Sequence, residues 1–198
     1  MSDYVAGGVR ERAVPRGSGV GVWGMAMLIA SEVTLFGTFI GSYYYLRFSA
    51  PQWPPAGTPE PRVVVPLVMA GILATSSLPM QLAANAARGG RLWSTRALLV
   101  WAVAVQCGYL VWAIHDFTQQ LQHSTPEDHA YGSIYYTLLG ADHAHVAVGI
   151  LLVVWLLWKL LRGLTLYRLN GVRAVALYWH AVNLLTLIVT GVLLSATI

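Results

Sequence analysis

Charged side chains are what this sequence has least of. Asp, Glu, Lys and Arg together make up 10% of its 198 residues, whereas hydrophobic residues make up 57%. An ordinary soluble domain has roughly a quarter of its residues charged. The composition therefore excludes a water-soluble globular protein and indicates an integral membrane protein.

Cysteine is almost absent as well. The single cysteine, Cys107, lies in an apolar run without a CxxC pattern or a neighbouring histidine. This excludes a disulfide framework and a thiolate metal site, and it predicts a small buried side chain. The sequence also lacks an internal repeat of the kind that builds many transporters, and it has no polar tract long enough to fold as a second domain. We therefore expect the protein to function in or beside the bilayer.

Long apolar runs are abundant instead. About 20 apolar residues are enough for a helix to cross the hydrocarbon core. The runs are apolar on every side, which favours helices over the alternating strands of a barrel. We predict an all-α, polytopic membrane protein with residues 1–17 as an N-terminal tail and 18–198 as one five-helix transmembrane domain. Its predicted spans are 18–47, 63–87, 93–115, 130–161 and 172–197.

Basic residues are distributed unevenly between the two ends of these spans. Of the 12 Lys and Arg residues, all but Arg47 and Arg62 fall on one side of the predicted bundle. Because basic residues near helix ends are retained in the cytoplasm, we predict a cytoplasmic N-terminus and an external C-terminus. The net charge of +4 follows from this asymmetry and does not indicate nucleic acid as a partner.

One acid interrupts the first apolar run. Glu32 is the only charged residue between positions 17 and 46, so it lies near the middle of the first span. Ionisable groups at that depth are costly and usually functional. Small residues around it, such as Gly37 and Gly41, permit close helix packing. Sequence alone leaves open a structural hydrogen bond to another helix, a role in proton handling and a role in lipid binding.

Further polar residues lie inside the fourth and fifth spans. On a helix, positions three apart share a face, so Asp142 can pair with His145, whereas His143 points elsewhere. His180 and Asn183 have the same spacing in the fifth span. We predict that Asp142, His145, His180 and Asn183 form an intramembrane polar network, as a proton route, a lipid site or a link between helices.

Metal and haem sites find little support in the sequence. A metal site needs three or four convergent ligands, which the fourth span alone does not supply, so we expect none in this chain. A b-type haem remains a weaker alternative. His129 and His143 stack along one helix, but the third and fifth spans offer only His115 and His180 as partners.

Five short motifs occur in order along the chain. They are SEVTLFGTF at 31–39, WPP at 53–55, YGS at 131–133, HVAVG at 145–149 and YWHAVN at 178–183. Taken together they resemble subunit III of the haem-copper oxidases, in its shorter bacterial form with five helices. Two positions depart from the pattern of that family. Asp142 stands where the family usually has a histidine, and Asn183 stands where it usually has an aspartate.

The resemblance implies an accessory subunit of the bacterial cytoplasmic membrane, without catalytic residues or redox centres of its own. Haem and copper are then expected in the partner subunits, which would be the catalytic subunit I with subunits II and IV. It implies bound phospholipid and support of proton uptake. Glu32 matches a membrane-embedded glutamate that reacts with carbodiimides in that family. Trp53, Tyr178 and Trp179 lie in the motifs and are candidate contacts for lipid or a neighbouring subunit.

Three functions therefore remain distinct at this point. The first is subunit III of a proton-translocating cytochrome c oxidase of the aerobic respiratory chain, a non-catalytic part of an oxidoreductase complex. A related alternative is the accessory subunit of a quinol oxidase or of a nitric oxide reductase. The alternative from another class is a free-standing proton channel or transporter that uses Glu32, Asp142, His145 and His180 as relay groups.

Overall fold

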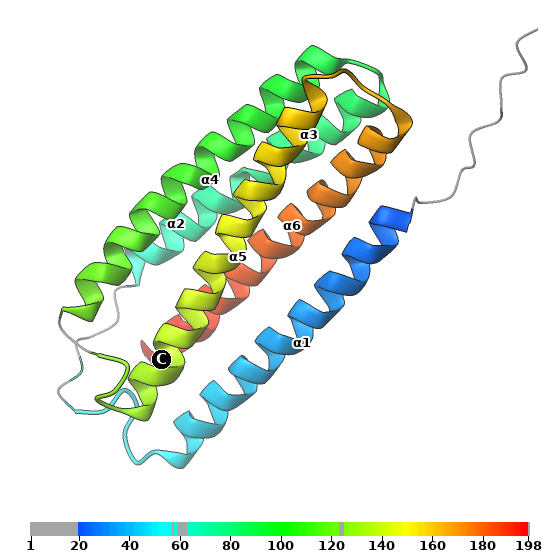
Figure 1. Ribbon diagram of the computed structural model, residues 1–198. Helices are drawn as coiled ribbons and strands as arrows, with labels where there is room; N and C mark the ends of the chain where they lie inside the picture. The colour runs from blue at the N-terminus through cyan, green and yellow to red at the C-terminus, as the bar shows by residue number, and fades with distance from the viewer. Residues whose placement is uncertain (1–19, 57, 59–62, 123–124, 198) are drawn as a thin grey trace, which may run out of the picture.

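A computed structural model describes residues 20–56, 58, 63–122 and 125–197 of the chain, and within these ranges the regular elements are all helical (Figure 1). The predicted tail at 1–17 lies outside the described residues. The helices are α1 (Val20–Ser49), α2 (Val64–Thr75), α3 (Ser77–Arg88), α4 (Leu92–Leu121), α5 (Ala130–Leu160) and α6 (Leu166–Leu194), followed by the 3-10 turn η1 (Ser195–Thr197).

Five helical segments are long and apolar enough to cross a membrane, which confirms the predicted fold class. Four of them are single helices, and the fifth, Val64–Arg88, consists of α2 and α3 in succession. The start of α1 and the turns after α3 and α5 lie at the same end of the bundle (Figure 1). The basic residues of both turns therefore gather there. Which end faces the cytoplasm stays a prediction from the charge asymmetry.

The break between α2 and α3 at Ser76 follows from a proline. Pro79 has no backbone N–H, so it cannot bond the carbonyl four residues earlier, and its ring crowds that carbonyl. The chain tightens at this point, where the N–H of Ser76 bonds the carbonyl of Leu73 at 3.0 Å. Pro79 and Ser76 are both buried against the rest of the bundle. The second span therefore contains a kink in its interior with its own hydrogen-bonding needs.

Helix α6 is the centre of the bundle, and α1 lies at its edge (Figure 1). α6 contacts α1, α2, α3 and α5, whereas α1 contacts α5 and α6. The largest core cluster surrounds Trp179 of α6, and α1 contributes the buried rings of Phe36 and Tyr43 to a second cluster. The bundle thus has a well-packed body of α2 to α6 and a more peripheral first helix.

The loop that follows α1 packs back onto the bundle through aromatic rings. Trp53 donates its indole N–H to the hydroxyl of Tyr43 at 3.2 Å and contacts the ring of Tyr131 edge-on. Beside Tyr131, a Cβ on Gly132 would lie 2.8 Å from the carbonyl oxygen of Thr125. Only glycine permits this approach, which explains the YGS motif at the start of α5.

Candidate functional site

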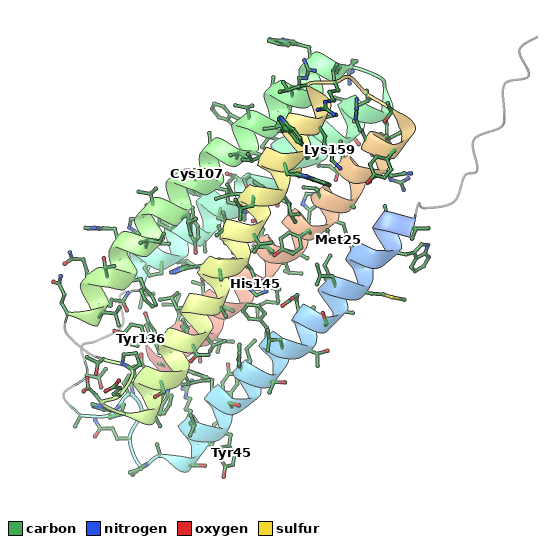
Figure 2. The ribbon with its side chains drawn as sticks, viewed as in Figure 1. Met25, Tyr45, Cys107, Tyr136, His145 and Lys159 are labelled. Carbon is green, nitrogen blue, oxygen red and sulfur yellow. The ribbon has the colours of Figure 1, made fainter. Side chains whose placement is uncertain are left out.

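The acid in the first span has a partner on another helix. Glu32 of α1 and His145 of α5 meet with 2.7 Å between Oε2 of the carboxyl and Nε2 of the imidazole. Both residues lie near the middle of helices of 30 and 31 residues, so the contact sits near the middle of the bilayer. His145 is labelled in Figure 2. The side chains are 22% exposed for Glu32 and 17% for His145 in the isolated chain.

The surroundings fix the imidazole of His145. Its Nδ1 lies 2.6 Å from the carbonyl oxygen of Ala141, one turn earlier on α5. The ring of Phe36, one turn after Glu32 on α1, packs edge-on against it with 5.1 Å between centroids. The hydroxyl of Tyr178 on α6 donates to the backbone carbonyl of His145 at 3.3 Å. Helices α1 and α5 therefore hold the ring in one orientation, and α6 contacts the backbone of His145.

This geometry determines how the pair carries its proton. A backbone carbonyl only accepts hydrogen bonds, so Nδ1 of His145 must be the protonated nitrogen that donates to Ala141. A single further proton then lies between Nε2 and the Glu32 carboxyl. It sits either on the acid, as a neutral pair, or on the imidazole, as an ion pair. Both arrangements have no net charge, which lowers the cost of an acid in the middle of the membrane.

Asp142 and His145 take different partners, although they share a face of α5. Asp142 is buried and accepts a hydrogen bond at 2.7 Å from the hydroxyl of Thr186 on α6. His143 points elsewhere, as helical geometry predicted, and contacts the rings of Tyr109 and Phe117 on α4. The fourth span thus sends one polar group to each of its neighbours α1, α6 and α4.

Asn183 of α6 serves the kink in the second span. Its Nδ2 donates toward the carbonyl of Leu73 at 3.2 Å and the hydroxyls of Ser76 and Ser77 at 3.1 and 2.9 Å. The Leu73 carbonyl can only accept, which assigns the NH2 group to this side of the amide. Gln106 of α4 donates to the Oδ1 side at 3.4 Å. An ionised aspartate here would have no N–H to offer, so the asparagine suits this kink.

The residues around Asn183 were missed by sequence reasoning. Ser76 also accepts a hydrogen bond at 3.0 Å from the indole of Trp179, and Ser76 and Gln106 are both fully buried. One signal was available, because a proline inside an apolar span marks a kink where the regular helical hydrogen bonds are interrupted and other polar partners are expected. The identity of that donor required the fold.

His180 lies apart from these groups. Its Nε2 is 3.2 Å from Oε1 of Gln81 on α3, at a partly exposed position. Within the described part of the chain, no hydrogen bond joins the contacts of Glu32, Asp142, Asn183 and His180 to one another. The structure therefore shows separate interhelical links where the sequence predicted one network, because each side chain leaves its helix toward a different neighbour.

The three aromatic candidates also differ in placement. Trp53 is half-buried in the loop after α1, against Tyr43 and Tyr131. Tyr178 and Trp179 are 3% and 0% exposed, so they pack inside this chain and do not face lipid or another subunit. Their polar atoms serve interhelical hydrogen bonds.

The described residues contain no group of three or more His, Cys, Asp or Glu side chains that could hold a metal ion. What they do contain is five segments long and apolar enough to span a membrane, joined to one another by interhelical hydrogen bonds. These features define a multi-pass membrane protein whose polar residues join helices.

Comparison with known proteins gives the family. The family model described as cytochrome c oxidase subunit III matches residues 5–194. The cytochrome c oxidase subunit 3 of Alkalihalophilus pseudofirmus is 30% identical over 87% of this chain and 84% of its own length. That of Synechocystis is 27% identical over 84% of this chain and 72% of its length, and that of the turtle Pelomedusa subrufa is 28% identical over 83% and 65%.

The chain belongs to the cytochrome c oxidase subunit III family. It is an accessory subunit of the oxidase, of a family that lacks redox centres, and it forms a complex with the catalytic oxidase subunit. Together with the five spans, its bacterial relatives place it in the bacterial cytoplasmic membrane as a multi-pass protein.

Proposed function

We propose that this subunit supports proton uptake and durability of the catalytic subunit through the contact between Glu32 and His145. The observation that carries the proposal is the 2.7 Å distance between these two side chains, which joins α1 to α5 near the middle of the membrane. One proton is shared within this contact, and the pair remains partly exposed at the surface of the isolated chain. It can therefore exchange that proton with a neighbouring group.

The same contact holds the first helix to the bundle. In α1, only 6% of the most apolar stretch is buried, against 28% in α5. Only Phe36 and Tyr43 of α1 are fully buried, and its other packed side chains are partly exposed. A polar link at mid-membrane then controls the position of the helix and of any phospholipid bound along it. Large exposed apolar side chains such as Met27 and Val33 give an acyl chain a surface to contact.

The complex that we propose is a cytochrome c oxidase with subunits I, II and IV, with haem and copper in the partner subunits and a cytoplasmic N-terminus for this chain. The names of its relatives favour cytochrome c over quinol as donor. A neighbouring gene for a subunit with a dinuclear copper site would support this assignment. Neighbouring genes for a quinol oxidase or a nitric oxide reductase, without a gene for the copper subunit, would overturn this assignment.

The test is purification of the tagged chain with its natural partners in mild detergent. We expect haem absorbance from the co-purified catalytic subunit. Glu32→Gln keeps a hydrogen bond to His145 but removes the shared proton, whereas Glu32→Ala removes both. We expect normal assembly with Glu32→Gln, together with a shorter catalytic lifetime over many turnovers and less bound phospholipid by mass spectrometry. Normal lifetime, proton pumping and lipid content in both variants would overturn the role of Glu32.

The free-standing channel gains no support from the separate placement of its relay groups. Its own test is proton flux in liposomes that contain only the purified chain. We expect no flux above that of empty liposomes. Flux that disappears with Glu32→Gln would favour the channel over the accessory role.

A further inference from the structure

Amide and imidazole side chains lie on the outer surface of the bundle where α3 packs against α6. Gln81 and Asn85 of α3 are exposed, and His180 of α6 is partly exposed beside them. His180 contacts Gln81 at 3.2 Å, and the Nε2 of Gln81 lies 3.5 Å from Oδ1 of Asn85. Arg88 also donates to Oδ1 of Asn85. We call Gln81, Asn85, Arg88, Arg173 and His180 the α3/α6 polar face.

This polar face extends well into the membrane. At a rise of about 1.5 Å per residue, Gln81 lies about 10 Å from the end of α3 at Arg88. His180 lies at a similar distance beyond the exposed Arg173 of α6. Ser77 and Asn183 continue the polar groups toward the kink near the middle of the bilayer, joined at 2.9 Å. Exposed amides at such depth rarely face lipid, because hydrocarbon offers their donors nothing to bond.

The other outward surfaces at this depth are different. On α4, Trp101 is 65% exposed, about 13 Å from the start of the helix at Leu92, and its exposed neighbour Val100 is apolar as well. Nearer the middle of α1, the hydroxyls of Thr34 and Thr38 are exposed but bond backbone carbonyls of their own helix. These surfaces expose apolar side chains, or hydroxyls that are already bonded, whereas the α3/α6 polar face exposes amide groups.

We propose that the α3/α6 polar face is the surface by which this chain docks onto the catalytic subunit. The inference rests on the assembly with that subunit and adds where the contact lies. In a complex, a membrane-embedded surface whose hydrogen-bond donors lack acceptors is covered by a protein that supplies those acceptors.

The donors define the chemistry of the docking helix. Oδ1 of Asn85 accepts hydrogen bonds from Gln81 and Arg88, and among the described residues its Nδ2 has no acceptor. Arg88 at the end of α3 and Arg173, seven residues into α6, add two exposed guanidinium groups. The face therefore fits a transmembrane helix of the catalytic subunit that presents hydrogen-bond acceptors at the depth of Gln81 and Asn85, and a carboxylate near the two arginines.

Photo-crosslinking in the assembled complex tests this surface. The photoreactive residue p-benzoylphenylalanine is placed at position 81, about 10 Å from the helix end, or at position 85, about 5 Å from it. As a control matched in depth to position 81, it replaces the exposed Trp101. After irradiation in native membranes, the complex is purified through a tag and its adducts are identified by mass spectrometry. We expect adducts with the catalytic subunit from positions 81 and 85 and lipid adducts or none from position 101.

Co-purification of the catalytic subunit is scored in the same samples, which separates the two ideas. If the catalytic subunit does not co-purify with the unmodified chain, the assembly itself is contradicted. If it is present, lipid adducts or no adducts from positions 81 and 85 would overturn the docking surface alone. Adducts with the catalytic subunit from position 101 in their place would also overturn it.

A double substitution provides a second measurement. Gln81→Leu with Asn85→Leu removes the amides while keeping side chains of similar size. We expect at least a tenfold loss of co-purified catalytic subunit, with the isolated variant retaining its helical content by circular dichroism. The control Trp101→Leu should leave co-purification unchanged. Unchanged co-purification with the double variant would contradict the proposal.

Discussion

Helices α1 and α6 are almost the same length, 30 and 29 residues, and both are apolar enough to span a membrane. Nevertheless 50% of the most apolar stretch is buried in α6 and only 6% in α1. Because lipid is as apolar as a protein core, hydrophobicity does not distinguish a central helix from a peripheral one. The difference lies in the partners: α6 packs on four helices, whereas α1 packs on two, mostly through partly exposed side chains, and adds the contact of Glu32 with His145.

The largest effect is expected at the central helix. Asn183→Asp places a carboxylate against the carbonyl of Leu73, where the amide now donates. A buried donor is lost and a charge is introduced, so we expect a loss of about 3 kcal/mol or more in the free energy of unfolding. Thermal unfolding in detergent measures this loss. Ser77→Ala, which removes one of three acceptors, serves as the comparison and should cost about 1 kcal/mol. Equal stability of both variants would contradict the role of Asn183.

The peripheral helix is joined to the rest of the bundle by the contact of Glu32 with His145 near its middle and by a hydrogen bond from Arg47 to Ser195 at its end. In a double-mutant cycle with Glu32→Ala and His145→Ala, we expect a coupling energy of about 1–3 kcal/mol, since the two side chains contact each other directly. The measurement is thermal unfolding of the complex, together with protease cleavage within α1. Additive effects of the two substitutions would show that the contact does not hold α1.

A smaller effect is expected for the link between α5 and α6. Thr186→Val keeps the shape of the side chain but removes the donor to Asp142, so we expect a loss of about 1–2 kcal/mol. Thr190→Val, one turn further along the same helix, is the matched control. A loss as large for Thr190→Val would show that the bond to Asp142 is not the cause.

The smallest effect lies in the loop before α5, outside both helices compared. The backbone N–H of Thr125 donates to Asp128 at 2.6 Å, which lowers the pKa of this carboxyl below its ordinary value of 3.8. The ionised carboxyl therefore stabilises the folded loop fully above pH 3.8, the ordinary pKa. This stabilisation is lost as the pH falls through the lowered pKa of the folded loop. We expect Asp128→Asn to lower the melting temperature slightly at pH 7, and we expect this difference to shrink as the pH falls below 3.8. A difference that stays the same as the pH is lowered would contradict this assignment.

Much of the fold could be predicted from the sequence, and less of the site. The apolar runs were sufficient to predict five membrane-spanning segments, because a span must make all its backbone hydrogen bonds within the helix and present apolar side chains to lipid. The kink at Ser76 was not predicted, although Pro79 signals it. The sequence placed each polar residue on its helix: Glu32, Asp142, His180 and Asn183. Their partners lie on other helices, however. How two helices cross depends on both of them and cannot be predicted from the sequence of either one.

The sequence by itself determined that this protein is a helical membrane bundle with an acid in the middle of its first span, and the order of its motifs pointed to the oxidase family. Both follow from composition and from local patterns along one chain. Only the tertiary structure decided that His145 neutralises Glu32, that Asn183 serves the kink and that α6 is central. Those depend on distances between residues far apart in the chain, which packing of whole helices sets and no local pattern encodes.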